Sequence, residues 1–299
     1  MEKRGAILGR PIVPREHGAW AVLYGAFIAG VGVAGQVTLP VGLFFVAVTA
    51  AALGNGPLTI LVRPAASPTW QADRGRALAW LAVYGAIFGL AVLPLFLAYR
   101  LTFLTAFGMG AACFLLMRAY LLRGRDDRSL AGELLGAAGL SMVGPTAHAV
   151  ATRAVAPVGA LLWLLLFLFF ASGVFYVRMR IRGMLARRPG ATPAHQTAGM
   201  ECGGAAAALR TTAAQRTAYR SCLAYHLVLL VALPLLAVLH LVPWAILLAF
   251  APALWRAAAG LRRQEGQLDL KRLGWSEVAQ TLVFLLLLVA ALRLPDPLG

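Results

Sequence analysis

The chain has 299 residues, of which 61% are hydrophobic and only 13% are charged, and its mean hydropathy is +0.78. Soluble domains are about 45–50% apolar and about 25% charged. This composition argues against a soluble enzyme, a disordered chain and a disulfide scaffold, and it indicates a polytopic membrane protein. The formal charge of +16 does not indicate nucleic acid, because no recognition motif is present and membrane proteins gather basic residues on cytoplasmic loops.

Long apolar stretches follow one another along the chain. A membrane-spanning helix needs about 20 mostly apolar residues, and about nine stretches meet this rule. Helices are the expected element because lipid offers backbone polar groups no hydrogen-bond partner. We therefore predict an all-α, polytopic transmembrane helical bundle that forms a single integral membrane domain over residues 1–299. The predicted spans are 18–35, 38–62, 77–99, 101–121, 130–150, 157–180, 219–240, 242–260 and 275–293.

The basic residues predict the orientation of these spans. With the N-terminus in the cytoplasm, the loops on the outer side carry only Arg100, Arg153 and Arg293, and nearly all other basic residues fall inside. We expect a bacterial inner-membrane protein with its N-terminus inside and its C-terminus outside. The segment 183–215 is rich in Ala, Gly, Thr, Pro and Arg, and we expect a flexible basic cytoplasmic loop there.

The approach to the first span carries three ionisable residues, Arg15, Glu16 and His17. Glu16 and His17 can exchange protons, and Arg15 can hold an anion. Two interpretations are open for this group. It is either part of a ligand site, or a first-turn carboxylate that the helix dipole favours.

The second span ends in a polar stripe around Pro57. Asn55, Thr59 and Arg63 are spaced i, i+4 and i+8, so they share one helix face. Pro57 cannot donate a backbone hydrogen bond, so we expect a kinked or broken helix here. A broken helix with a polar stripe is one way to build a ligand site in a membrane. The alternative is a structural kink with Arg63 reaching the membrane surface.

Two later spans carry the other candidates. Glu133 lies more than a turn into the fifth span and is the strongest single candidate, because ionisable groups within spans usually face the bundle interior. Its alternative role is a structural ion pair with a loop arginine. At the end of the sixth span, Tyr176, Arg178 and Arg180 could bind a phosphate or carboxylate, or could be ordinary cytoplasmic positive charge.

Other polar residues receive structural interpretations. Glu277, at the start of the ninth span, is interpreted as a carboxylate that favours a helix N-terminus. His226 and His240 are interpreted as span or interface residues.

Four motifs resemble the YwiC-like family of bacterial membrane proteins. They are Pro14–Trp20, which contains the run EHGAW, and Gly132–Gly136, Phe175–Arg178 and Leu273–Glu277. That family has no assigned biochemical function, so the resemblance implies a membrane protein and not an activity.

The nine-span plan is also similar, more distantly, to the UbiA prenyltransferase superfamily. Those enzymes hold Mg²⁺ on aspartate-rich motifs at the ends of spans two and six. Only Asn55 matches the first motif, whose aspartate positions fall on Gly56, Thr59 and Arg63. The carboxylate ligands that Mg²⁺ needs are therefore missing from that motif, and the cofactor stays unknown.

Three functions are compatible with the sequence. The favoured one is the binding of an isoprenoid or another anionic lipid at the cytoplasmic helix ends, with catalysis left open. The alternatives are a proton-coupled transporter that uses Glu133 and a membrane assembly scaffold. The expected surroundings are the lipid bilayer, and nucleic acid is not an expected partner.

Overall fold

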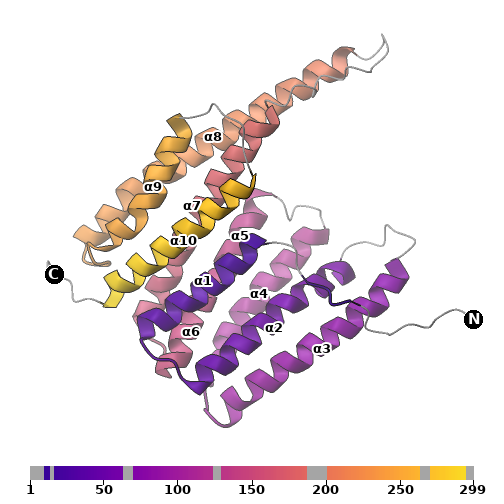
Figure 1. The fold of residues 1–299 in the computed structure, drawn as a ribbon, viewed down its shortest axis with the longest axis vertical. Helices are drawn as coiled ribbons and strands as arrows, with labels where there is room; N and C mark the ends of the chain where they lie inside the picture. Colours follow the sequence, from indigo (N-terminus) through magenta and orange to yellow (C-terminus); the bar gives the residue numbers. More distant parts are fainter. Residues whose placement is uncertain are drawn as a thin grey trace, which may run out of the picture. The chain divides into compact units, whose positions relative to one another are not determined.

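The computed structural model describes residues 10–13, 17–62, 70–123, 129–186, 201–262 and 270–293. All regular secondary structure in these ranges is helical, which confirms the all-α prediction (Figure 1). The helices are α1 (His17–Ala34), α2 (Leu39–Val62), α3 (Trp70–Leu97), α4 (Leu104–Arg123), α5 (Leu130–Ser141), α6 (Val143–Thr152), α7 (Pro157–Ala186), α8 (Glu201–Val238), α9 (Ile246–Arg262) and α10 (Leu270–Arg293).

Every predicted span coincides with a described helix, and α5 and α6 share the fifth span. By length and composition, 7 helical segments of the described chain could cross a membrane, and α5 and α6 together form one of them. The apolar helix α1 is shorter than these segments. At 17 residues, α9 is also too short to be counted with them. These helices make the chain a multi-pass membrane protein.

The fifth span is interrupted at Met142, where α5 ends and α6 begins. Pro145 has no backbone N–H, so it cannot donate to the carbonyl of Ser141. Helix α2 also contains a proline but is not interrupted, and it continues through Pro57 to Val62. A break in the second span was therefore the wrong alternative, and the kink expected at Pro57 stays a prediction. A proline removes only one backbone hydrogen bond, and a helix packed among neighbours tolerates that loss.

The predicted loop 183–215 is largely helical at both ends. Helix α7 continues to Ala186, and α8 begins at Glu201, so only residues 187–200 of that segment lie outside the described residues. The prediction was wrong for 183–186 and 201–215. It relied on the absence of bulky apolar residues, but alanine has the highest helix propensity, and the segment 205–208 is a run of alanines.

Four turns on the predicted outer side each contain one residue in the left-handed region. These residues follow α1, α3, α6 and α8, and they are Gly35 (φ 71), Arg100 (φ 55), Arg153 (φ 58) and His240 (φ 54). A left-handed residue after the last turn is a common way to end a helix, because it reverses the chain within a few residues. The outer connections are therefore short.

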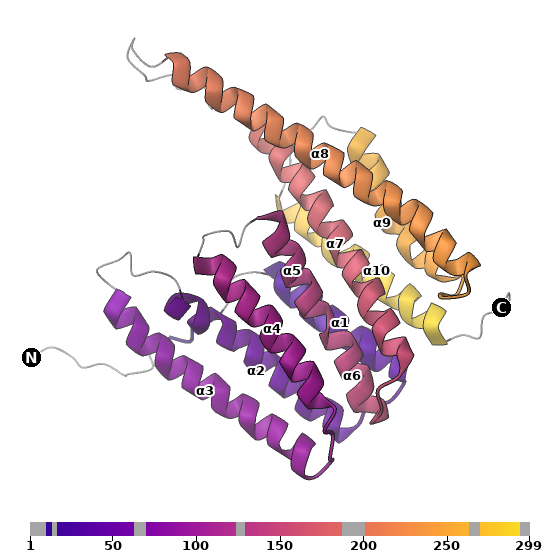
Figure 2. The ribbon, with the colours of Figure 1, turned by 180° about the vertical axis from the view of Figure 1, so that it is seen from behind.

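The chain divides into two compact units, Met1–Phe167 and Leu168–Gly299, with α7 contributing to both. The single domain expected from the sequence stays a prediction. In the first unit α2 and α3 pack along each other, and α1 packs on α6 (Figures 1 and 2). The α1–α6 contact is close at Gly30, where an added Cβ would lie 2.1 Å from the carbonyl oxygen of Gly144. Only glycine permits that approach.

The second unit contains the remainder of α7 and helices α8–α10. Its core is aromatic, with the rings of Phe169 and Phe284 stacked at a centroid distance of 3.8 Å. Phe250 of α9 meets Phe284 edge-on at 5.2 Å. These rings hold α7, α9 and α10 together and fix which faces of the three helices point inward.

Candidate functional site

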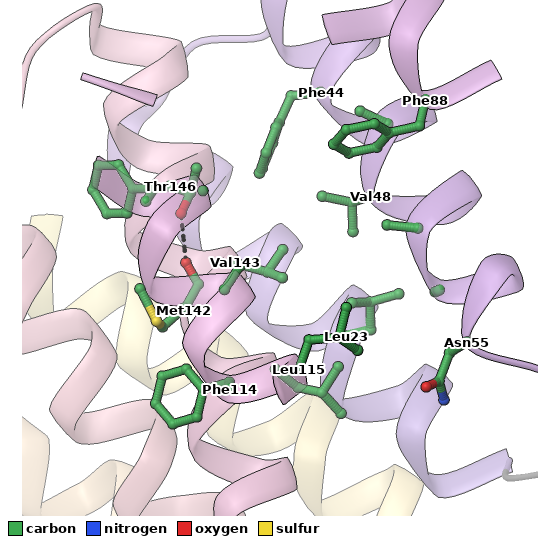
Figure 3. Close-up of a pocket in the computed structure, with 18 of the residues that line it drawn as sticks. Leu23, Phe44, Val48, Asn55, Phe88, Phe114, Leu115, Met142, Val143 and Thr146 are labelled. Carbon is green, nitrogen blue, oxygen red and sulfur yellow. Dashed lines mark hydrogen bonds between the residues drawn. The ribbon is translucent and has the colours of Figure 1, made fainter. Parts of the chain in front are cut away.

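The first unit contains a partly open cavity of about 540 Å³ that is lined by residues of α1 to α6 (Figure 3). Its walls are mainly apolar. Leu23 of α1, Phe44 and Val48 of α2, Phe88 of α3 and Leu115 of α4 are among the side chains that form them. Such a surface suits a hydrocarbon chain, since it offers few hydrogen-bond partners.

Two threonines in the wall are already engaged with their own backbone. Thr105 Oγ1 donates to the carbonyl oxygen of Thr102 at 2.7 Å, and Thr146 Oγ1 donates to that of Met142 at 2.7 Å (Figure 3). Their hydroxyl hydrogens are therefore used locally. The other side chains in the lining that carry nitrogen or oxygen atoms are Trp20, Asn55 and Arg118.

Asn55 and Arg118 lie toward the same end of the cavity. Figure 3 places Asn55 and Leu115 toward one end and Phe44 and Thr146 toward the other. Arg118 follows Leu115 by about one turn of α4. Its guanidinium lies over α5, because Nη1 is 4.0 Å from the position of an added Cβ at Gly136. The cavity is thus apolar along most of its length and carries a cation and an amide at one end.

The residues predicted around the first two spans have different positions. Asn55 lines the cavity. Thr59 does not line it, and its hydroxyl donates to the carbonyl oxygen of Asn55 at 2.8 Å, one turn back along α2. Arg15, Glu16 and Arg63 lie outside the described residues, and His17 is described only as the first backbone position of α1. Of the two described residues of the polar stripe predicted on α2, one therefore lines the cavity.

The remaining predicted residues do not line this cavity. Glu133 is half-buried on α5, about one turn before Gly136, where the Arg118 guanidinium lies. Tyr176, Arg178 and Arg180 belong to the second unit. Tyr176 is buried there, and the two arginines are half-buried.

Sequence reasoning missed two arginines because it assigned them to the general positive charge of cytoplasmic loops. Arg118 falls within the predicted span 101–121, and Arg256 falls within the predicted span 242–260. Arginines inside spans are costly and usually face the bundle interior. Their position within the apolar window was the signal that could have identified both. Among the described residues, no group of three or more His, Cys, Asp or Glu side chains is placed to hold a metal ion.

The helices and this cavity define a class, the polytopic α-helical membrane proteins with a cavity among their helices. Within that class, residues 13–148 match the family described as YwiC-like protein. The match confirms the resemblance predicted from Pro14–Trp20 and Gly132–Gly136, and all residues that line the cavity fall inside it. The motifs Phe175–Arg178 and Leu273–Glu277 lie beyond it. No curated protein and no solved structure matches the chain.

Proposed function

We propose that the first unit binds an amphipathic lipid with an anionic head group, such as an isoprenoid diphosphate or an anionic phospholipid. The apolar chain would occupy the cavity, and the head group would meet Arg118 and Asn55. The observation that carries the proposal is the distribution of polar side chains in the cavity lining. Asn55 and Arg118 lie toward one end, and most of the remaining wall is apolar. Its volume of about 540 Å³ lies within the range of about 300–1,000 Å³ typical of ligand pockets.

The chemistry of the polar end favours an anion. A guanidinium is always charged and presents parallel N–H groups to phosphate oxygens, and the Asn55 amide can donate a further hydrogen bond. By the distribution of basic residues, this end faces the cytoplasm of a bacterial inner membrane, where anionic head groups are available. The proposal concerns binding, and catalysis is not part of it.

The test is a thermal unfolding measurement on the full chain in detergent with farnesyl diphosphate, farnesol or inorganic diphosphate. A ligand at about 100 times its dissociation constant stabilises the folded protein by about 2.7 kcal/mol. We expect the largest shift with farnesyl diphosphate, because only this probe engages both the walls and the polar end. A run with Mg²⁺ added tests whether carboxylate ligands contribute.

Two variants, each with a matched control, separate the contribution of the polar end of the cavity from that of its apolar wall. Arg118→Gln should weaken farnesyl diphosphate binding and leave farnesol binding nearly unchanged, while Arg262→Gln, at an exposed position of α9 in the second unit, should change neither. Ala52→Phe fills part of the cavity and should weaken both prenyl ligands, whereas Ala160→Phe on an exposed position of α7 should not. Equal binding by all four variants would contradict the proposal.

A further inference from the structure

A second group of buried polar side chains lies in the second unit, around Arg256 of α9. Arg256 is only 8% exposed. Its Nη1 donates to Oε1 of Glu277 on α10, and its guanidinium carbon lies 4.4 Å from the ring centroid of Tyr176 on α7. The cation is therefore held from two sides, by a carboxylate and by an aromatic face.

The other edge of the guanidinium is unpartnered. Nε and Nη2 of Arg256 are both buried, and neither has a hydrogen-bond partner among the described residues. In the planar guanidinium these two nitrogens present parallel N–H groups along one edge. That fork is the geometry that binds a carboxylate or a phosphate through two oxygens. Glu277 contacts the group only through Nη1 and leaves the fork open.

The helices that hold this pair carry other buried polar atoms without a described partner. Ser172 Oγ is fully buried on α7, one turn before Tyr176 on the same helix face. Gln280 lies about one turn after Glu277 and donates through Nε2 to the carbonyl oxygen of Pro252 at 3.3 Å, which leaves Oε1 unpartnered. The group is therefore assembled from α7, α9 and α10.

Helix α8 adds His226, which is 6% exposed. Its Nδ1 lies 2.8 Å from the carbonyl oxygen of Cys222, so this nitrogen is the donor, and Nε2 has no partner among the described residues. Cys222 belongs to the same buried cluster as Tyr176, and the Tyr176 ring lies against the Arg256 guanidinium. Each of the helices α7, α8, α9 and α10 thus carries a polar side chain with a buried atom that has no partner among the described residues.

A purely structural ion pair does not explain this arrangement. Each buried donor without a partner costs about 1–3 kcal/mol, and a lysine in place of Arg256 would satisfy Glu277 without the extra N–H groups. Gly260 is also part of the arrangement, because an added Cβ there would lie 2.6 Å from Cε2 of Tyr176. The chain therefore keeps a glycine that lets the aromatic ring support the guanidinium.

We propose that the Nε–Nη2 edge of Arg256 binds an oxyanion of the carboxylate or phosphate type inside the second unit. Glu277 and Tyr176 are positioning residues that orient the guanidinium, and the Ser172 hydroxyl, on the same face of α7 as Tyr176, can donate a further bond. The oxyanion is either a small soluble anion or the head group of an anionic lipid. This site is separate from the lipid cavity and does not depend on it.

The test uses the full chain in detergent, titrated with inorganic phosphate or acetate against chloride at matched ionic strength, with thermal unfolding as the readout. A parallel arm uses nanodiscs of phosphatidylcholine with and without phosphatidic acid. Saturable stabilisation by phosphate or acetate identifies a soluble ligand, and stabilisation only by phosphatidic acid identifies a lipid head group. Either result supports the site if it depends on Arg256.

Arg256→Lys is the decisive variant, because it keeps the charge opposite Glu277 and removes the fork. We expect at least about a tenfold loss of affinity, with no loss in Arg262→Lys, an exposed arginine on the same helix. If Arg256→Lys does not fold, the double variant Arg256→Gln/Glu277→Gln removes the fork without leaving an unpaired charge.

Wild-type protein that shows no saturable response to any probe, or a response that Arg256→Lys retains, would overturn the proposal. Arg118→Gln should leave this response intact, so the failure of one proposal is distinguishable from the failure of the other.

Discussion

The buried contact between Arg256 and Glu277 allows the free energy of unfolding of variants at these two positions to be predicted. Removing one partner of a buried ion pair costs about 3–5 kcal/mol, because the other charge is left uncompensated. The side chain of Arg256 is 9% exposed and that of Glu277 is 26% exposed. Glu277→Leu therefore leaves the more buried charge alone and should destabilise by an amount near the upper end of this range. Arg256→Met leaves a partly hydrated carboxylate and should lie near the lower end.

The double variant Arg256→Met/Glu277→Leu separates the pair from the packing of each side chain. Replacing a whole buried pair by apolar residues is often neutral or stabilising, so we expect the double variant to be less destabilised than either single variant, which corresponds to a coupling energy above about 5 kcal/mol. The assay is reversible unfolding in mixed micelles, with Arg262→Met as the exposed control. Single-variant effects that add to within about 0.5 kcal/mol would show that the two residues do not interact.

Three further predictions concern packing and orientation. Gly30→Ala should destabilise by about 1–3 kcal/mol by overpacking, because the new Cβ meets the Gly144 carbonyl, whereas Gly42→Ala, with nothing within 4 Å, should be neutral or stabilising in the same unfolding assay. Gly260→Ala should also destabilise by about 1–3 kcal/mol, and this cost should largely disappear in a Tyr176→Ala background; an undiminished cost would mean that the ring is not the obstacle. In a chain without its native cysteines, Arg153→Cys should react with a membrane-impermeant maleimide in intact cells and Arg262→Cys only after permeabilisation, and the reverse labelling would invert the proposed orientation.

The positions of the helices could be predicted well from the sequence because lipid imposes one simple requirement. A stretch of apolar residues long enough to cross the membrane must satisfy its own backbone, and only a helix does so within one segment. The residues at which the helices begin and end were less predictable. The alanine-rich start of α8 lacks the bulky residues that define a span, yet its backbone is helical from Glu201. Hydrophobicity identifies what is buried in lipid, and it does not report helix propensity outside it.

The candidate sites were predicted only in part. Asn55 was identified from its place in a polar stripe. Thr59, one turn further on, does not line the cavity, and its hydroxyl donates to the backbone of α2 instead. Arg118 and Arg256 were missed because a basic residue near a helix end has a ready explanation in membrane topology. Only tertiary packing shows that Arg256 meets Glu277 and Tyr176, which are distant in the sequence.

The central claim is that the cavity of the first unit holds an amphipathic anionic lipid. Photo-crosslinking with a benzophenone analogue of farnesyl diphosphate, followed by peptide mass mapping, tests it directly. We predict adducts on peptides of α2 and α4 that unlabelled farnesyl diphosphate displaces and that decrease in Arg118→Gln. Adducts confined to the second unit, or adducts that the unlabelled compound does not displace, would contradict the claim.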